Sequence, residues 1–322
     1  MTEAETLRRQ LEHCLQKTDL QIGEKYEGKV RDNYVTGGKR VIVSTDRLSA
    51  FDVVLTTLPF KGQVLNQLSA FWLEKTKGIA ANHMISVPDP NVMTARNCTP
   101  IAVEFVVRGY ITGVTKTSLW YNYSQGARDF CGHRLPEGLK KDQKLDHPIV
   151  TPTTKAEKGM HDESISREEI ISRGIMDAEE FDAVAETSLK LFEYGTRHCA
   201  SNRIILVDTK YEFGKDENGE ILLIDEIHTP DSSRFWHKDS YDSLFDKGEE
   251  QRRIDKEYVR KWLADRGYTG EGRPPAIPDD VRVEAATRYI EAFEKITGQM
   301  FRPVEGDAGK RIAVAAPGWR LE

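Results

Sequence analysis

The sequence of 322 residues predicts an α+β fold of two lobes, an N-terminal lobe of mainly antiparallel β-structure and a larger α+β lobe that ends in helices. Short β-like runs dominate residues 21–107. A long amphipathic helix followed by a β-hairpin occupies residues 177–227, and helical patterns return in residues 254–297. The chain is also longer than one compact core usually needs. We therefore expect an N-terminal lobe of residues 1–108 and a second lobe of residues 109–322.

The elements of the N-terminal lobe follow from local patterns. Residues 3–17 are predicted to form an amphipathic helix, because leucines at positions 7, 11 and 15 recur at helical spacing. Residues 21–35 and 40–44 have strand character, and Gly37-Gly38 between them predicts the turn of a hairpin. The rest of this lobe is predicted as a helix at 63–77 and a buried strand at Ile101–Val107.

The second lobe begins with a segment that differs from the rest. Residues 125–165 are rich in Gly, Pro, Lys and Asp and show little periodicity, so they are predicted to form long loops, which are often functional. A helix is expected over 177–200, followed by a hairpin of residues 204–214 and 220–227. Two further helices are predicted near 254–266 and 279–297.

The composition describes a soluble globular protein. Hydrophobic residues make up 39% of the chain and charged residues 30%, which differs from disordered and from membrane chains. No stretch approaches the roughly 18 consecutive apolar residues of a spanning helix. The first ten residues are acidic and polar, so no secretory signal is expected. We therefore predict a cytoplasmic protein that makes no contact with membranes.

Charge and cysteine content narrow the partners further. The net charge of −6 argues against a general nucleic-acid-binding surface, although a few residues can still form a small basic pocket for phosphates. The four cysteines contain no Cys-x-x-Cys pair, so a zinc site or a disulfide framework is not expected. We expect reduced thiols at Cys14, Cys98, Cys131 and Cys199, and a protein that binds small molecules, does not bind nucleic acid and is a monomer.

The hairpin carries the strongest chemical signal. Asp208, Lys210 and Glu212 alternate along one strand, so their side chains share one face. Asp225 follows a run of four apolar residues on the return strand, where an antiparallel register could place it beside Glu212. Two such carboxylates repel each other unless a cation bridges them, and Mg²⁺ prefers one or two carboxylates together with substrate phosphates. The alternative is a solvated face on which Lys210 pairs with Asp208 and Glu212.

The same hairpin resembles a signature of the SAICAR synthetase family, and further motifs follow the family's order along nearly the whole chain. Residues 206–214 (Leu-Val-Asp-Thr-Lys-Tyr-Glu-Phe-Gly) are similar to that signature, and residues 100–113 are similar to a second one. The other matching motifs are Gly28 to Asp32, Ser49 to Asp52, Thr154 to Glu157, His161 to Glu163, Asp225 to Arg234, and Asp255 to Arg260.

The resemblance implies an ATP-dependent ligase of de novo purine synthesis. In this family's reaction, ATP phosphorylates the carboxylate of the aminoimidazole ribonucleotide CAIR. The amino group of L-aspartate then displaces phosphate, which gives SAICAR, ADP and phosphate. Such a reaction needs positioning and cations that stabilise the spread negative charge, and it requires no side-chain nucleophile. The implied cofactors are ATP and Mg²⁺.

The resemblance also implies which residues form the site. The expected ATP-binding residues are Gly28, Lys29, Val30, Arg31, Lys210, Glu212 and Asp225, of which Glu212 and Asp225 would hold Mg²⁺. The expected substrate-binding residues are Asp52, Arg108, Asp162, Ser233, Arg234, Lys256 and Arg260. Lys210, Arg108 and Asp225 are the expected catalytic residues.

The glycine corner of residues 28–31 is expected to cover the ATP phosphates. Gly28 lets the backbone approach closely, and Lys29 and Arg31, two apart on a strand, would present positive charge from one face. The corner is not a phosphate-binding loop of Gly-x-x-x-x-Gly-Lys-Ser/Thr form. Without the other motifs, an ordinary β-turn with solvated basic residues would explain it.

One position departs from the family pattern. A serine that contacts the substrate phosphate usually follows the glycine at the position of Gly113, but this chain has Val114 there, followed by Thr115 and Lys116. Either Thr115 or Lys116 replaces the contact, or the contact is lost.

Two other classes of function compete with the ligase. A phosphotransferase with a different acceptor would have a similar nucleotide lobe, although the Asp-Phe-Gly and His-Arg-Asp motifs of protein kinases are absent from the sequence. A nucleotide-binding interaction module would retain Lys29, Glu212 and Asp225. It would have no need of a second anion site at Arg108, Asp162 and Arg234. Release of ADP that depends on both CAIR and aspartate would distinguish the ligase from both.

Overall fold

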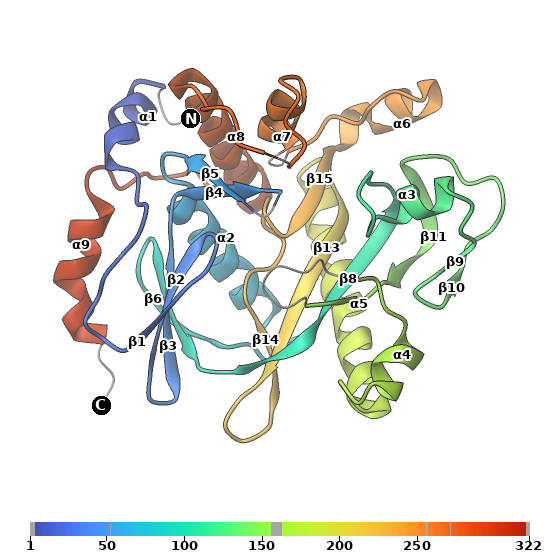
Figure 1. Cartoon of the computed structure of the whole chain (residues 1–322), viewed down its shortest axis with the longest axis horizontal. Coiled ribbons are helices and arrows are strands. Elements are labelled where there is room, and N and C mark those ends of the chain that lie inside the picture. The colour runs from blue at the N-terminus through green and yellow to red at the C-terminus, as the bar shows by residue number, and fades with distance from the viewer. Residues whose placement is uncertain (1–3, 52, 156–162, 255–256, 271, 320–322) are drawn as a thin grey trace.

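Two antiparallel sheets organise the chain (Figure 1). The computed structural model describes residues 4–51, 53–155, 163–254, 257–270 and 272–319. Helices make up much of the remaining structure and cover both sheets. The α+β class predicted from the sequence is therefore confirmed.

The first sheet has the strand order β1-β2-β3-β7-β6. Its strands are β1 (Glu24–Glu27), β2 (Arg31–Thr36), β3 (Lys39–Ser44), β6 (Met84–Asp89) and β7 (Val92–Arg96). The predicted hairpin is present, since β2 pairs with β3 across a tight turn in which Gly37 has a φ of 56°, a conformation that favours glycine. A short hairpin of β4 (Arg47–Ala50) and β5 (Val53–Thr57) follows β3.

The second sheet has the order β11-β8-β13-β14, with β12 also paired to β8 and β15 also paired to β13. Its strands are β8 (Thr99–Ile111), β11 (Gln143–Val150), β12 (Thr153–Thr154), β13 (Ile204–Lys215), β14 (Ile221–Ile224) and β15 (Ser233–His237). The long strands β8 and β13 lie at its centre. The predicted hairpin of β13 and β14 is confirmed, with Glu212 opposite Ile224.

The helices lie where apolar spacing predicted most of them. Helix α5 (Ala178–Ser201) begins after Asp177, whose side chain accepts a hydrogen bond from the backbone N–H of Glu180 and so caps the helix. Besides α5, the helices are α1 (Ala4–Gln10), η1 (Leu11–His13), α2 (Lys61–Thr76), α3 (Leu119–Ser124), α4 (Arg167–Ser172), α6 (Lys238–Lys247), α7 (Glu257–Ala264), α8 (Asp279–Thr297), α9 (Ala308–Ala315) and η2 (Ala316–Trp319). Some of them, notably α6 and α9, were not predicted from the sequence.

Two sequence predictions require correction. The segment 125–165 is not a run of long loops, because β11 forms within it and pairs with β8, and the small hairpin of β9 (Asp129–Phe130) and β10 (His133–Arg134) lies at its start. The helix predicted over residues 3–17 ends as the short helix η1 at His13. Beyond it, Leu15 is buried in irregular structure.

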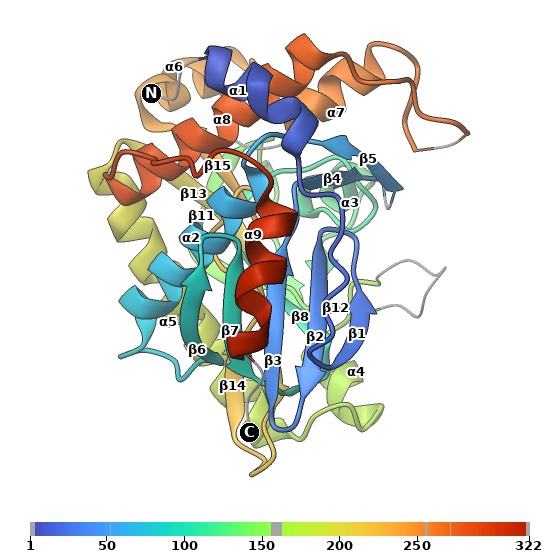
Figure 2. The same cartoon turned by 90° about the vertical axis from the view of Figure 1, so that its left-hand side faces the viewer.

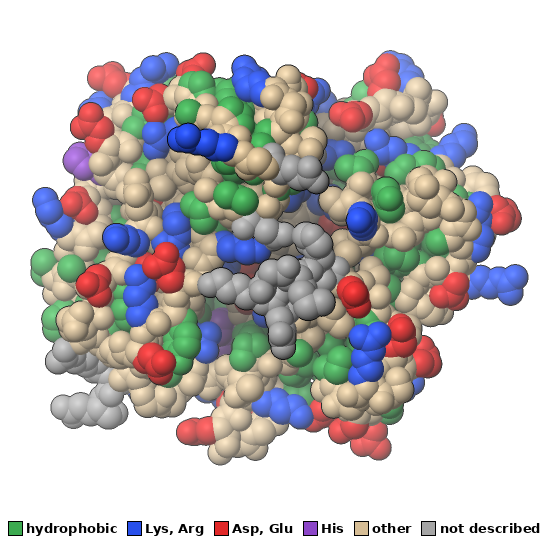
Figure 3. Space-filling view, in the orientation of Figure 1, with side chains coloured by type: hydrophobic (Ala, Val, Ile, Leu, Met, Phe, Trp, Pro, Cys, Tyr) green, Lys and Arg blue, Asp and Glu red, His purple; other side chains and the backbone are tan. Residues whose placement is uncertain are grey.

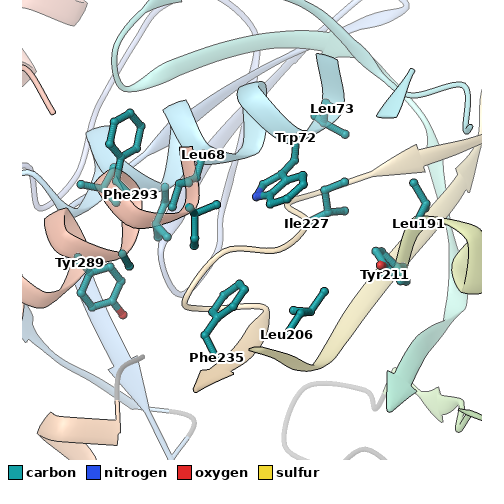
Figure 4. Close-up of a cluster of buried hydrophobic side chains, with 14 of the residues drawn as sticks. Leu68, Trp72, Leu73, Leu191, Leu206, Tyr211, Ile227, Phe235, Tyr289 and Phe293 are labelled. Carbon is teal, nitrogen blue, oxygen red and sulfur yellow. The ribbon is translucent and has the colours of Figure 1, made fainter. Parts of the chain in front are cut away.

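The main core lies where the second sheet meets helices α2, α5 and α8. Trp72 and Leu68 of α2 face Phe235 and Leu206 of the sheet, and Phe293 of α8 closes the cluster (Figure 4). Aromatic side chains of this size bury large apolar areas and dominate core packing. The core thereby fixes β13 and the chain that leads into β15.

The C-terminal helix α9 returns to the first sheet (Figure 2). Ala308 and Ile312 of α9 pack with Tyr34, Val41 and Val43 of that sheet. The change from the first sheet to the second occurs at residues 97–98, and residue 108 lies inside β8. A division into lobes of residues 1–108 and 109–322 therefore stays a prediction. No helix in the described part of the chain is both long and apolar enough to span a bilayer.

Candidate active site

A pocket of about 460 Å³ lies between the first sheet and the hairpin of β13 and β14. The turn between β1 and β2 (residues 28–30) forms one side of it, and Lys210, Glu212 and Asp225 form the other. Figure 3 shows that Lys and Arg side chains border the central hollow on one face of the molecule. The predicted ATP-binding residues are thus brought together around a single pocket.

The pocket combines positive charge with an apolar portion. Its described lining includes six cations, Lys29, Arg31, Arg40, Arg96, Lys155 and Lys210. They face two carboxylates, those of Glu212 and Asp225, so positive charge is in excess. Apolar lining is provided by Val30, Ile42, Pro100 and Ile224. A ligand with several negative charges and an apolar ring fits this arrangement.

Glu212 is held between two lysines. Lys210 Nζ lies 2.5 Å from Glu212 Oε1 and 2.8 Å from Glu104 Oε1, and Lys155 pairs with the other carboxylate oxygen of Glu212. Burial alone would raise the pKa of Glu212, but the two lysines lower it below its usual value. Burial would conversely lower the pKa of Lys210, and its two carboxylate neighbours raise it. Both groups are therefore charged at neutral pH.

Asp225 faces the same pocket from the end of β14. It follows Ile224, the residue opposite Glu212, and has a φ of 64°, a left-handed conformation uncommon outside glycine. Its carboxylate pairs with Arg31, whose Nη2 also lies 2.8 Å from Glu226 Oε1. Each of the two predicted metal ligands thus has a cationic partner from the protein.

A metal ion at this pair would need further oxygen ligands. In the described residues, no group of three His, Cys, Asp or Glu side chains is arranged to hold a metal. Two carboxylates can supply only part of the octahedral shell of Mg²⁺, which it usually completes with waters and substrate phosphates. The donor set therefore fits a metal that arrives with a phosphate ligand.

A second basic cluster lies further along β13. Arg234 Nη1 donates to Asp208 Oδ2 at 2.7 Å, and Arg108 Nη1 lies 3.8 Å from the same oxygen. The Arg108 side chain is 5% exposed, and it also donates to Thr151 Oγ1 at 2.7 Å and to the Thr117 carbonyl at 2.9 Å. Burial lowers the pKa of Arg108 to about 10, so its guanidinium remains charged at neutral pH. Two arginines around one carboxylate leave a net positive charge for an anion.

The departure at Val114 has a clear structural counterpart. The Val114 side chain is 67% exposed, whereas Ser118 is buried, with its Oγ 2.7 Å from Thr115 Oγ1. A Cβ added to Gly113 would lie 2.4 Å from Ser118 Oγ and 3.0 Å from Arg234 Nη1. The Ser118 hydroxyl and the arginine cluster therefore meet at Gly113. The sequence analysis considered only the two residues that follow Val114 and missed this serine.

The remaining predicted substrate residues have different outcomes. Ser233 begins β15 beside Arg234, and its Oγ donates to Thr209 Oγ1 at 2.7 Å. Arg260 lies on α7 and is partly buried. Three predicted residues lie outside the part of the chain that the structure describes: Asp52, Asp162 and Lys256.

Several pocket residues were not predicted from the sequence, among them Arg40, Arg96 and His83. His83 is 4% exposed, and its Nε2 has no hydrogen-bond partner among the described residues. Burial, together with Arg31 and the two other arginines, lowers the pKa of His83 to about 3, so the imidazole is neutral. A buried polar atom without a partner is costly, and a bound ligand would remove that cost. These residues are far apart in the sequence and belong to no shared motif.

A basic pocket beneath a glycine-containing turn, next to a second basic cluster on the same sheet, is typical of enzymes that transfer a phosphoryl group between two bound molecules. Comparison with known proteins identifies the particular family of enzymes. The SAICAR synthetase family model matches residues 24–275, and the chain belongs to that family.

Relatives and solved structures agree with this assignment. The phosphoribosylaminoimidazole-succinocarboxamide synthase of Legionella pneumophila (strain Paris) is 50% identical over 290 residues, which cover 89% of this chain and 92% of the relative. A solved SAICAR synthase from Saccharomyces cerevisiae, complexed with SAICAR, has a TM-score of 0.77 at 34% identity. The match covers 89% of this chain and 99% of the yeast chain. A type-2 SAICAR synthetase in complex with ADP has a TM-score of 0.65 at 27% identity, over 87% of this chain and 100% of its own.

Family membership decides between the alternatives that the sequence left open. The chain is an ATP-dependent carbon–nitrogen ligase of purine biosynthesis that joins the carboxylate of CAIR to L-aspartate. It is neither a phosphotransferase with another acceptor nor an interaction module.

Proposed function

We propose that the pocket between the two sheets binds ATP and that the cluster of Arg108, Asp208 and Arg234 binds CAIR. The observation that carries this proposal is the strand β13, which contributes to both sites from one face. Lys210 and Glu212 line the pocket, and Asp208 holds the two arginines. Residues two apart on a strand are separated by about 7 Å, so the two ligands would lie close enough for direct phosphoryl transfer.

The turn of residues 28–30 would cover the phosphates, and Lys210 would stand beside them. Lys210 is already charged through its two carboxylate neighbours, so no proton transfer is required before it can stabilise negative charge. The apolar portion around Ile42 and Ile224 would receive the adenine ring. His83 would meet the nucleotide with its unpartnered nitrogen.

We further propose that Glu212 and Asp225 hold Mg²⁺ together with the ATP phosphates. When bound, Mg²⁺ would neutralise charge on the phosphates. The lysines beside Glu212 keep that carboxylate ionised, as a metal ligand must be, and Asp225 pairs with Arg31. Their oxygen donors suit a hard cation of this kind.

The arginine cluster would bind the anionic groups of CAIR. Arginine presents a planar fork of donors that matches phosphate and carboxylate groups, and burial of Arg108 strengthens that attraction. The Ser118 hydroxyl beside Arg234 would donate to the substrate phosphate, which is the contact that Val114 cannot make. Orientation by these groups would direct the CAIR carboxylate toward the γ-phosphate, after which the amino group of aspartate displaces the phosphate.

The reaction would take place in the cytoplasm. The cysteines are all free in the structure, which is consistent with a reducing compartment. The monomeric state stays a prediction, and sedimentation analysis of the purified protein would check it.

Binding measurements on two variants test the assignment of the two sites. Lys210→Met should weaken ADP binding by about tenfold or more and leave CAIR binding nearly unchanged, because it removes a charge from the pocket alone. Arg234→Lys should do the reverse, because a lysine keeps the charge but loses the bidentate geometry. Calorimetry with each ligand separately measures both affinities. Equal losses for both ligands in both variants would contradict the assignment.

A further inference from the structure

We propose that Arg47 is a positioning residue for the ATP phosphates, which holds the turn of residues 28–30 from behind so that the N–H groups of the turn face the pocket. The inference rests on the proposed function, which places the phosphates against this turn. Arg47 itself does not line the pocket. Its action would pass entirely through the backbone of the turn.

The carbonyl groups of residues 28–30 accept hydrogen bonds from Arg47 and Thr45. Arg47 Nη2 donates to the Gly28 carbonyl at 2.9 Å, and Arg47 Nε donates to the Lys29 carbonyl at 3.0 Å. The next carbonyl, that of Val30, accepts from the Thr45 N–H at 3.0 Å and from Thr45 Oγ1 at 2.7 Å. Three consecutive carbonyl groups are therefore held on the side away from the pocket.

Peptide geometry fixes where the N–H groups of the turn point. In a trans peptide the C=O of one residue and the N–H of the next point in opposite directions, and no cis peptide occurs among the described residues. The N–H groups of Lys29 and Val30 are consequently directed to the side opposite Arg47. Residues 28–31 line the pocket whereas Arg47 and Thr45 do not, so we infer that this opposite side faces the pocket. Successive N–H groups that converge in this way form an anion-binding concavity.

The charge of Arg47 is already neutralised behind the turn. Its side chain is 8% exposed, and Nη2 also donates to Asp32 Oδ1 at 2.8 Å. Burial alone would raise the pKa of Asp32, but hydrogen bonds from Thr18 and Arg47 lower it, so the carboxylate stays ionised. Thr18 donates to Asp32 Oδ2 through its N–H at 2.6 Å and its hydroxyl at 2.9 Å. An arginine paired in this way orients the turn and adds little attraction of its own for phosphate.

Only an arginine can make this set of contacts. The guanidinium group carries five N–H donors in a rigid fork, and here they also reach the carbonyl of Gln16 through Nη1. A lysine at position 47 would keep the positive charge beside Asp32, but its single nitrogen could not span the carbonyls of both Gly28 and Lys29. The substitution Arg47→Lys therefore separates charge from geometry.

The experiment compares Arg47→Lys with Arg311→Lys. Arg311 is a matched control, because it also pairs with an aspartate of the first sheet, Asp89, at 2.7 Å and 3.1 Å, and its other side-chain hydrogen bond reaches Asn91 and not the turn. Calorimetry measures the affinities for ADP, for inorganic tripolyphosphate and for adenosine, and steady-state assays give KM for ATP and for CAIR. Arg47→Lys should weaken the binding of ADP and of tripolyphosphate about tenfold and raise the KM for ATP by a similar factor. The affinity for adenosine and the KM for CAIR should not change. Arg311→Lys should change none of the five.

The comparison of phosphate ligands with adenosine excludes a merely structural role. The positioning role is overturned if Arg47→Lys weakens adenosine binding as much as tripolyphosphate binding. It is also overturned if Arg47→Lys, like Arg311→Lys, changes none of the affinities and KM values. Thr45→Val removes the hydroxyl that donates to the Val30 carbonyl and that also accepts from the Arg47 N–H, and it provides a second test should Arg47→Lys fail to fold. It should weaken tripolyphosphate about threefold, and an unchanged affinity would overturn the role as well.

The failure of the inference can be told apart from a failure of the proposed function. If Lys210→Met weakens ADP binding and Arg47→Lys does not, only the positioning role is wrong. If neither variant affects ADP binding, the ATP site lies elsewhere and the proposed function fails with it.

Discussion

Individual charges in the pocket are set by their immediate partners. The carboxylates of Glu212 and Asp225 are in contact with Lys210, Lys155 and Arg31, and those cations are in turn held in place by the carboxylates. A buried charge without a partner would be unstable, so the pairs maintain the site before any ligand binds. A metal with its phosphate ligands could then replace some of these internal contacts.

The first prediction at this scale concerns Asp225. Asp225→Asn keeps the shape of the side chain and removes its charge, so kcat should fall by about a hundredfold or more, while the melting temperature changes by only a few degrees. Turnover over a Mg²⁺ titration, together with thermal unfolding, measures both effects. Glu220→Gln is the control, because Glu220 is an exposed carboxylate at the other end of the same hairpin and should tolerate the change. An Asp225→Asn enzyme with normal turnover and Mg²⁺ dependence would refute the metal-ligand assignment.

A second prediction concerns the hydroxyl beside Arg234. A hydrogen bond to a charged group contributes about 1.5–3 kcal/mol, so Ser118→Ala should weaken CAIR binding by about tenfold or more and leave ADP affinity unchanged. Thr115→Val should have a smaller effect, because the Thr115 hydroxyl reaches Ser118, at 2.7 Å, and acts through it. Calorimetry with CAIR measures both variants. A larger loss of CAIR affinity for Thr115→Val than for Ser118→Ala would show that Thr115, and not Ser118, makes the phosphate contact.

At the scale of elements, the chain between β14 and β15 is fixed by two helices. Lys61 of α2 is fully buried and donates to Asp231 Oδ2 at 2.8 Å, and Tyr289 of α8 donates to Asp231 Oδ1 at 2.5 Å. Asp231 lies two residues before Ser233 and three before Arg234. Packing of α2 and α8 against each other is therefore linked to the position of Arg234.

This link leads to a prediction for Lys61. Lys61→Met leaves the Asp231 carboxylate buried with one charged partner fewer, which should lower the free energy of unfolding by about 3 kcal/mol and raise KM for CAIR more than KM for ATP. Lys75→Met on the exposed side of the same helix should change stability by no more than about 0.5 kcal/mol. Urea denaturation and steady-state kinetics of both variants make the comparison. Identical stabilities for the two would show that the buried pair contributes nothing.

At the scale of the whole molecule, buried titratable groups determine how stability depends on pH. Burial lowers the pKa of His83 and of His228 to about 3, and burial raises the pKa of Asp46 to about 6. Below pH 6.5 the unfolded chain binds protons at both histidines, whereas the folded protein does not, so stability falls as the pH falls toward 3. Between pH 6 and 3.8 the folded protein binds a proton at Asp46 that the unfolded chain does not. This proton cancels the effect of one of the two histidines on stability.

Near pH 5 these three groups together should lower the free energy of unfolding by about 1.4 kcal/mol for each unit that the pH falls, the effect of one net proton. His83→Gln removes one of the two histidines, so its slope near pH 5 should be close to zero. Urea denaturation of both proteins at several pH values between 4.5 and 5.5 measures the slopes. Equal slopes would show that His83 is protonated in the folded protein.

The sequence by itself determined the elements whose signal is local. Helix α5 and the hairpin of β13 and β14 were predicted because apolar spacing, alternation and turn residues all lie within a few positions of one another. Alternation along β13 also placed Asp208, Lys210 and Glu212 on one face, where the structure has them. The motifs identified the family because they occur in a fixed order.

Only the tertiary structure decided the features that depend on distant contacts. Strand β11 has a mostly exposed and irregular pattern, so nothing local distinguishes it from a loop, and its pairing with β8 creates it. The pocket gathers Arg40, His83 and Arg96 from separate strands and connections, and Ser118 and Arg234 both approach Gly113, which follows the end of β8. Local periodicity reflects the geometry of neighbouring residues, whereas these contacts depend on how remote segments pack around a shared core. The shared face of Asp208, Lys210 and Glu212 could therefore be predicted from the sequence, and the partners that remote segments bring to it could not.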